Sequence, residues 1–447
     1  MSIRGVVAIV VLVALIGPAT AGADVQRLSS SGGALSPAAA FTDDGGARLA
    51  WTETTDGGGA IALASLAPGA SAFAAPVSAL TGTSYERAPT VGFDGRGLSV
   101  TVVQRSHAPY RRARAVIQRA DGAYLGAVTL SAKGHSAGIP TVAVARDGSA
   151  VAAWRWYDGT VWIAQAALRP AGGVFGPPID LPATHGDTRG GNAFAPKVSV
   201  SPGGRVALAW ESDGELRAVT GTTSGLGAPQ LVGTYRPNYG PFAVAVGDTG
   251  RAIVTWVDVL YARGDSDGPD GPPTTTKVAL SGPDGAFAPA EPFPFDGSVG
   301  DDGPAVAVTS DGTALLGIAA TISNHHGALY TASAPPEGSM GAAAKVADTG
   351  TYTVSPHLSA GPAGDALLTY TVDAESADGD GIVSVVNVAR RPAGGAFGPS
   401  VALSDPAEEA LDPVAALGPA GRAIVSWVQS PSGGGDGNLD AVVLAGP

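Results

Sequence analysis

The chain has 447 residues, of which 65 are Gly and 35 are Pro, and it contains no Cys. Gly and Pro together exceed a fifth of the chain, against roughly 12% in average usage, which excludes a helical bundle or a coiled coil. A hydrophobic content of 45% with only 15% charged residues excludes a fully disordered chain. The net charge of −13 argues against nucleic acid and against an anionic membrane as partners, because phosphate binding needs a basic face.

Residues 1–23 have the three parts of a secretory signal peptide. Arg4 supplies the positive start, residues 6–16 form an apolar stretch, and Ala21-Gly22-Ala23 fits the small-residue cleavage pattern. This apolar stretch is too short for the roughly twenty residues that a membrane-spanning helix needs. We therefore predict a secreted, extracellular protein that does not span a membrane, with the cell envelope as an alternative location and residues 24–447 as the mature domain.

A repeated segment runs through the mature chain, and each copy begins with a proline. The proline precedes a short β-rich run, a glycine turn and a second run that mostly ends in an aromatic residue, as in "PTVAVARDGSAVAAW" and "PKVSVSPGGRVALAW". The eight anchoring prolines, 45 to 63 residues apart, are Pro37, Pro89, Pro140, Pro196, Pro241, Pro304, Pro356 and Pro413. Regular copies at such a period indicate a repeat fold.

Each copy predicts four short antiparallel strands. The first strand follows the proline, which a strand tolerates at its first residue. A turn such as Asp147-Gly148 joins it to the second strand, because Gly supplies the positive φ of a hairpin turn. A variable loop leads to the third strand, and a second Gly turn opens the fourth, as in "VFGPPIDL" from Val174. Four such strands at a period near 50 residues are typical of a β-propeller blade.

The first strands also predict how the blades pack. Two and four residues beyond the proline stand larger apolar side chains such as Val142 and Val144, whereas the opposite face carries small residues such as Ala143. Such faces interdigitate when sheets stack, so we expect this strand to be buried on both sides.

The two ends of the mature chain predict a closed ring. The last copy stops after its third strand, "LDAVVLAGP", while "DVQRLSSSGG" from Asp24 is similar to fourth strands such as "PSVALSD". The first segment would complete the last blade and leave no unpaired edge. We predict one all-β domain, a single eight-bladed β-propeller of four-stranded antiparallel blades, with seven or nine blades as alternatives. The chain resembles secreted bacterial β-propeller repeat proteins in general.

One segment has a partial calcium-binding pattern. Asp436, Asn438 and Asp440 in "GDGNLDAVV" resemble the loops of FG-GAP propellers, where alternating side-chain oxygens bind the ion. The preceding residues 431–435 offer no carboxylate, so a Gly-rich turn with Asp as a turn residue is the favoured interpretation. We predict no cofactor, with Ca²⁺ at this loop as the alternative.

No catalytic residue is predicted. The first strands line the central channel of a propeller, and a glycosidase would need paired carboxylates there. The residues at the first strand position after each anchor, with the fifth copy aligned from Trp256 because it has one extra residue after its proline, include no Asp or Glu: Ala38, Thr90, Thr141, Lys197, Ala243, Ala305, His357 and Val414.

The two faces of the predicted ring differ. The short-turn face carries short, similar Gly-rich turns, which join the first strand to the second and the third strand to the fourth. The variable-loop face carries the loops between second and third strands and between copies, where aromatic residues, Arg and His gather as on recognition surfaces. The predicted ligand-binding residues, from copies two to four, are His107, Tyr110, Arg112, His135, Trp156, Tyr157, His185 and Arg189. The alternative is that these loops merely hold the polar residues that strands exclude.

These observations favour a non-enzymatic secreted scaffold that binds a ligand or a protein on the variable-loop face. The local Arg and His residues suit a carbohydrate or another anionic ligand. The alternative is an extracellular propeller hydrolase or lyase that acts on polysaccharide.

Overall fold

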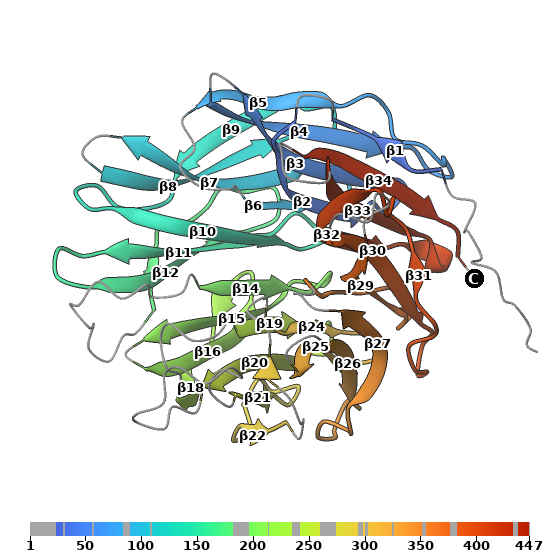
Figure 1. Cartoon of the computed structure of the whole chain (residues 1–447). Helices are drawn as coiled ribbons and strands as arrows, with labels where there is room; N and C mark the ends of the chain where they lie inside the picture. The colour runs from blue at the N-terminus through green and yellow to red at the C-terminus, as the bar shows by residue number, and fades with distance from the viewer. Residues whose placement is uncertain are drawn as a thin grey trace, which may run out of the picture.

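The computed structural model describes residues 24–29, 32–55, 58–83, 90–107, 110–181, 196–212, 214–234, 242–259, 274–293, 298–299, 303–323, 326–350, 355–375, 382–431 and 437–446. These residues form eight separate antiparallel sheets, one for each predicted copy, arranged as the blades of a ring (Figure 1). The chain is therefore an eight-bladed β-propeller, as the repeat predicts. Within the described residues no helix has the length and apolar character needed to cross a membrane.

Each blade runs from an inner strand at the ring axis to an outer strand. Blades one and two are β2 (Ala34–Phe41), β3 (Ala47–Thr55), β4 (Gly58–Leu66) and β5 (Val77–Thr83), then β6 (Thr90–Phe93), β7 (Ser99–His107), β8 (Tyr110–Gln118) and β9 (Tyr124–Thr129). Blades three and four are β10 (Ala137–Val144), β11 (Ala150–Tyr157), β12 (Trp162–Arg169) and β13 (Ile179–Asp180), then β14 (Lys197–Val200), β15 (Arg205–Ser212) and β16 (Glu215–Thr222), whose outer edge pairs with both β17 (Gly225–Leu226) and β18 (Gln230–Thr234).

The second half of the ring repeats this plan. Blade five is β19 (Phe242–Val246), β20 (Ala252–Val259), β21 (Thr274–Leu280) and β22 (Glu291–Pro292). In blade six, β23 (Ser298–Val299) and β24 (Ala305–Val308) both pair with β25 (Ala314–Ser323). The blade continues outward with β26 (His326–Ala334) and β27 (Ala344–Gly350). Blades seven and eight are β28 (His357–Ala360), β29 (Ala366–Glu375), β30 (Ile382–Arg391) and β31 (Val401–Ala402), then β32 (Glu408–Leu417), the short helical turn η1 (Pro419–Gly421), β33 (Ala423–Pro431) and β34 (Asn438–Leu444).

The segment that begins at residue 24 closes the ring, which confirms the predicted closure. β1 (Gln26–Arg27) pairs antiparallel with β34 as the fourth strand of blade eight, and the two lie side by side in Figure 1. The Arg27 Nε donates to Asp440 Oδ1 at 3.0 Å. The Gln26 side chain bonds the backbone of Phe73 in blade one twice, at 2.7 and 3.0 Å, so this segment ties the last blade to the first.

The repeated aromatic position forms the core between blades. Its occupants in the second strands are at most 1% exposed: Trp51, Val103, Trp154, Trp210, Trp256, Ile318, Tyr370 and Trp427. Trp154 packs with Val102 and Ala115 of blade two, and its indole Nε1 donates to Gln165 Oε1 at 2.9 Å. Burial of so large a side chain in each interface is the main source of stability between blades.

The inner strands interdigitate as predicted, although not all of their side chains are fully buried. A Cβ added to Gly92 of blade two would stand 2.6 Å from Val144 Cγ2 of blade three. The larger side chains of one inner strand therefore occupy the space beside the small residues of the preceding inner strand. Val144 itself is only half-buried, because it borders the central hollow of about 360 Å³ together with residues such as Phe41 and Leu417. The expectation of burial on both sides is thus only partly right.

The anchoring proline does not always begin the strand. β2, β10 and β32 start before Pro37, Pro140 and Pro413, and the pairing register of each shifts at the proline, which marks a β-bulge. The residue before each of these prolines has a positive φ of 47° to 51°. The bulge accommodates a residue that has no N–H for the ladder.

Candidate functional site

Four of the predicted binding residues lie together on the variable-loop face. Tyr110 begins β8, Trp156 and Tyr157 end β11, and His135 lies in the loop between blades two and three. The His135 ring lies 6.3 Å from that of Tyr110, 5.5 Å from that of Trp156 and 6.4 Å from that of Tyr157, measured between centroids. We call these four residues the aromatic cluster.

The aromatic cluster sits on strand ends more than on loops. The sequence predicts that the second strand of blade three ends at Trp154, but β11 continues to Tyr157. Tyr157 pairs directly with Trp162 of β12, so the hairpin extends the sheet beyond the interblade core. Strand backbone therefore holds Trp156 and Tyr157 in fixed positions, which favours a preformed site.

Two residues absent from the predicted binding set extend this cluster. The Trp162 ring lies 5.5 Å from that of Tyr157, and the Arg155 guanidinium carbon lies 4.7 Å from the Trp162 ring centroid. Arg155 and Trp162 thus form a cation–π contact. The sequence feature that indicates Arg155 and Trp162 is the short hairpin "WRWYDGTVW", which puts aromatic residues on both strands next to its turn.

Backbone hydrogen bonds fix the loops around His135. The Tyr157 N–H donates to the Ser136 carbonyl at 2.9 Å and so ties the interblade loop to β11. Asp158 Oδ1 accepts the N–H groups of Val161 and Thr160 at 2.8 and 2.7 Å. These bonds hold the pKa of the Asp158 carboxyl below its usual value, and Asp158 also interacts electrostatically with His135.

An arginine-lined hollow lies on blade two beside the aromatic cluster. Arg105 of β7, Arg112 and Arg114 of β8 and Thr129 of β9 border about 260 Å³ of space, which we call the arginine hollow. Arg105 faces Arg112 directly across the two strands. Within the described part of the chain, no carboxylate borders this hollow or forms an ion pair with these arginines.

A hollow that three arginines border, with no bordering carboxylate among the described residues, is unusual in a chain with more acidic than basic residues. The chain has 39 acidic and 26 basic residues, and like charges directly opposite each other on paired strands are destabilising. A cost of this kind that no described carboxylate relieves points to a functional site. Only Arg112 of the three belongs to the predicted binding residues.

Arg112 is held in place by Ser131. Its Nε donates to Ser131 Oγ at 3.0 Å, and its Nη2 donates to the Ser131 carbonyl. Burial lowers the pKa of the Arg112 guanidinium, although an arginine remains charged. Tyr110 stands two residues before Arg112 on β8, and alternate residues of a strand share a face, so Tyr110 of the aromatic cluster and Arg112 of the arginine hollow lie on the same face of β8.

The remaining predicted binding residues stay predictions. The backbone of His107 ends β7 and pairs with Tyr110, but its side chain lies outside the described part of the structure. His185 and Arg189 fall within residues 182–195, which also lie outside it.

Two of the three calcium candidates contact the ring-closing segment. Asp440 accepts from Arg27, and Asn438 Oδ1 accepts the Gly32 N–H at 3.2 Å. Asp436 lies outside the described residues. Within those residues, no group of three His, Cys, Asp or Glu side chains could hold a metal ion.

His357 is the titratable group that burial perturbs most clearly. It begins β28, directly after the anchoring proline of blade seven, and its Nδ1 is buried with no hydrogen-bond partner among the described residues. Burial lowers the pKa of His357 to about 4. The imidazole is therefore neutral at neutral pH.

This burial predicts a pH-dependent stability. In the unfolded chain His357 titrates near its ordinary pKa of about 6.5, so between pH 6.5 and 4 the unfolded state binds the proton and the folded state does not. The free energy of unfolding should fall by at most about 3 kcal/mol as the pH drops through this window. Urea unfolding of the wild type and of His357→Gln at several pH values measures the effect. Identical pH profiles for the two proteins would contradict it.

Comparisons with known proteins give structural similarity only. No protein-family model matches the chain, and no curated protein matches it. A protein of unknown function from Dyadobacter fermentans is 13% identical with a TM-score of 0.42, and the match covers 95% of this chain and 99% of that one. The β-propeller domain of the trilobed protease from Pyrococcus furiosus is 10% identical with a TM-score of 0.42, over 81% and 94% of the two chains. The polysaccharide lyase Uly1 is 10% identical with a TM-score of 0.40, over 78% and 88%.

Proposed function

We propose that the protein is a secreted, non-enzymatic β-propeller that binds an acidic carbohydrate on the variable-loop face of blades two and three. The observation that carries this proposal is the arginine hollow, three guanidinium groups without a carboxylate among the described residues, next to the aromatic cluster. The signal-peptide pattern of residues 1–23 supports secretion.

The two parts of the site suit the two parts of an acidic sugar. Guanidinium groups form paired, charge-assisted hydrogen bonds with carboxylates or sulfates. Aromatic rings offer a rigid apolar face to the C–H surface of a sugar ring while they retain a polar edge. Tyr110 is 41% exposed, so a polymer could reach this part of the aromatic cluster from solvent. The chain's overall negative charge would meanwhile repel anions from most of its remaining surface.

Titration calorimetry with polygalacturonate and its neutral methyl ester tests the proposal. We expect the acid form to bind and the methyl ester to bind at least about tenfold more weakly, because a charge-assisted hydrogen bond contributes about 1.5–3 kcal/mol. Arg105→Gln and Arg114→Gln should each weaken binding of the acid form by about tenfold. Added salt should weaken the wild-type interaction, since the site is solvent-accessible.

Arg96→Gln is the matched control. Arg96 is an exposed arginine of the same blade, in its short turn between β6 and β7, so this variant removes one charge from the opposite face. Its affinity should equal that of the wild type. Equal binding of polygalacturonate and its methyl ester, or unchanged affinity in both hollow variants, would overturn the proposal.

One observation favours a second candidate, a polysaccharide lyase. The His135 ring lies 6.3 Å from that of Tyr110 and 6.4 Å from that of Tyr157, and the arginines of the hollow on blade two can neutralise a uronate carboxylate. Neutral His135 would take the proton from the carbon next to that carboxylate. The bond from the adjacent ring carbon to the glycosidic oxygen would break, a carbon–carbon double bond would form, and a tyrosine O–H would protonate the leaving oxygen. Ultraviolet absorbance of the unsaturated product, lost in His135→Ala, would identify this activity and contradict the non-enzymatic proposal.

A further inference from the structure

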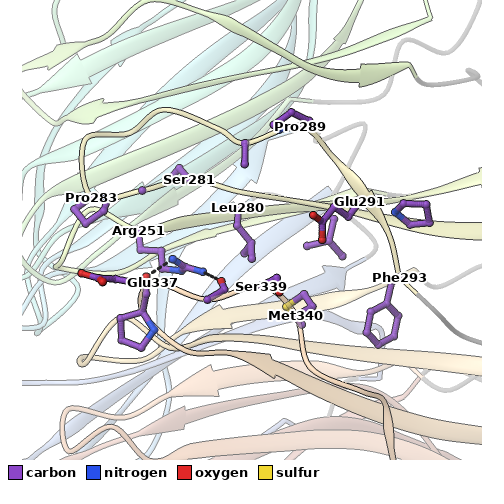
Figure 2. Close-up of a pocket in the computed structure, with 16 residues that line it drawn as sticks. Arg251, Leu280, Ser281, Pro283, Pro289, Glu291, Phe293, Glu337, Ser339 and Met340 are labelled. Atoms are coloured by element: carbon purple, nitrogen blue, oxygen red, sulfur yellow. Dashed lines mark hydrogen bonds between the residues drawn. The ribbon is translucent and has the colours of Figure 1, made fainter.

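A third hollow lies far from the proposed carbohydrate site, between blades five and six at the short-turn face. It encloses about 480 Å³, more than either the central hollow or the arginine hollow. β21 and the segment that leads to β22 form one wall, and the turn between β26 and β27 forms the other (Figure 2). We call it the rim hollow. Its volume lies within the range of small-molecule sites in proteins, roughly 300–1,000 Å³.

Arg251 is the buried charged side chain among the described residues that line the rim hollow. It is 4% exposed, and its Nη1 and Nη2 donate to the carbonyls of Pro336 and Gly338, which fixes the turn of blade six (Figure 2). Its Nε is buried with no hydrogen-bond partner among the described residues. Two of its five N–H groups are thus used by the fold.

The positive charge of Arg251 is incompletely compensated. Within the described residues it forms no ion pair. Burial lowers the pKa of its guanidinium, and the attraction of Glu337 does not offset this effect. Glu337 and Glu291 also border the hollow, but both are exposed, so solvent screens their charges. A buried cation in this state is stabilised by an anion that enters the hollow.

Apart from Ser281, Ser339 and the two glutamates, the rest of the lining is mostly apolar and rigid. Leu280, Phe293 and Met340 contribute apolar surface, and Phe293 is only 4% exposed. Four prolines, with fixed φ, stand in the walls: Pro283, Pro289, Pro292 and Pro336. Such walls keep the hollow open without a ligand, which reduces the entropy lost on binding.

We call the contact of the Arg251 guanidinium with the carbonyls of the next blade a clasp. Such a clasp does not by itself require a hollow. Arg422 makes a comparable contact between blades eight and one, in which its Nη1 donates to the Gly45 carbonyl, between β2 and β3, and its Nη2 donates to the Ala70 carbonyl, between β4 and β5. Arg422 borders neither the rim hollow nor the central hollow nor the arginine hollow. The rim hollow is therefore an addition to this device, and it places the arginine of one clasp at the wall of a space that a ligand can enter.

We propose that the rim hollow binds a small amphipathic carboxylate, with its anionic head on Arg251 and its apolar body against Leu280, Phe293 and Met340. This site is independent of the carbohydrate site, which lies on the other face of different blades.

Three probes that share one alkyl chain test the proposal: decanoate, decanol and decylamine, titrated into the full chain by calorimetry. We expect decanoate to bind at least about tenfold more tightly than decanol, because decanol lacks the charged contact, and decylamine to bind more weakly still. Tighter binding of decylamine would show that the rim carboxylates dominate and would overturn the proposal. Equal affinities of decanoate and decanol would overturn it as well.

Three variants locate the site. Arg251→Met should weaken decanoate binding at least about tenfold, whereas Arg422→Met, which breaks the equivalent clasp, should leave it unchanged. Met340→Trp fills the hollow while it keeps Arg251, and it should also weaken binding. Circular dichroism confirms that each variant is folded. Unchanged decanoate affinity in both Arg251→Met and Met340→Trp would contradict the assignment.

Discussion

Deletion of residues 24–29 is expected to destabilise the whole propeller by about 5 kcal/mol. This segment contains β1, the fourth strand of blade eight. The deletion removes buried Leu28, whose N–H donates to the Leu439 carbonyl at 2.8 Å, and Ser29, whose Oγ accepts the Leu439 N–H at 2.7 Å. It also removes the bonds from Gln26 to Phe73 that join the last blade to the first.

The deletion also leaves a carboxylate buried without its partner. The Asp440 side chain is 7% exposed, and it pairs with Arg27 at 3.0 Å. Burial raises the pKa of Asp440, and the attraction of Arg27 opposes that rise. Without Arg27 the ionised carboxyl is less stable, so the difference between the truncated and intact proteins should shrink as the pH falls and Asp440 is protonated.

Urea unfolding measures both effects, and a shorter deletion provides the control. Residues 24–25 are exposed and precede β1, so their removal should change the free energy of unfolding by less than about 0.5 kcal/mol. If the long and the short deletion unfold at the same urea concentration, ring closure by β1 does not stabilise the fold.

Trp154→Ala is expected to cost about 3–5 kcal/mol, the second large effect. Trp154 is 0% exposed at the interface of blades two and three. Its indole belongs to a chain of hydrogen bonds, since Gln165 accepts from it at 2.9 Å and donates to Asp180 at 2.7 Å. The truncation therefore leaves both a cavity and an unsatisfied buried amide.

Trp154→Phe separates the contributions of Trp154. The phenyl ring keeps most of the buried apolar volume and loses the hydrogen bond, so a smaller loss of about 1–3 kcal/mol is expected. Thermal and urea unfolding of both variants provide the measurement. A loss below about 1 kcal/mol for Trp154→Ala would mean that the repeated aromatic position is not the main source of stability between blades.

The blade count and the ring closure could be predicted because their signals are local and repeated. The anchoring prolines, Gly turns and buried aromatic residues recur along the chain, and each signal constrains only a few neighbouring residues. The pairing of β1 with β34 joins distant parts of the chain, yet the last copy lacks a fourth strand, and the missing strand identified its partner.

The bulges at the prolines could not be predicted from the same pattern. Pro140 lies within β10 and Pro196 precedes β14, although both begin similar sequences. The difference depends on whether the preceding residues also pair with the second strand, as Ala137 and Gly138 do with β11. A one-residue shift in register is decided by tertiary packing and not by local preference.

The candidate site was predicted in part. The aromatic cluster came from residues next to predicted loops, and the ring brings them together. Arg105 and Arg114 were missed, although "RSHAPYRRAR" concentrates arginines at one hairpin. The rim hollow could not be predicted, since Arg251, Phe293 and Met340 come from different strands and turns and meet only through the packing of two blades.

Hydrogen–deuterium exchange with and without polygalacturonate tests the central claim most directly, namely that the variable-loop face of blades two and three is the binding face. Protection should be concentrated in residues 105–114, 131–137 and 155–163, which contain the arginine hollow, the aromatic cluster and Trp162. Protection concentrated instead in the short turns, such as residues 94–98 and 146–149, or no protection at a saturating concentration, would contradict the claim.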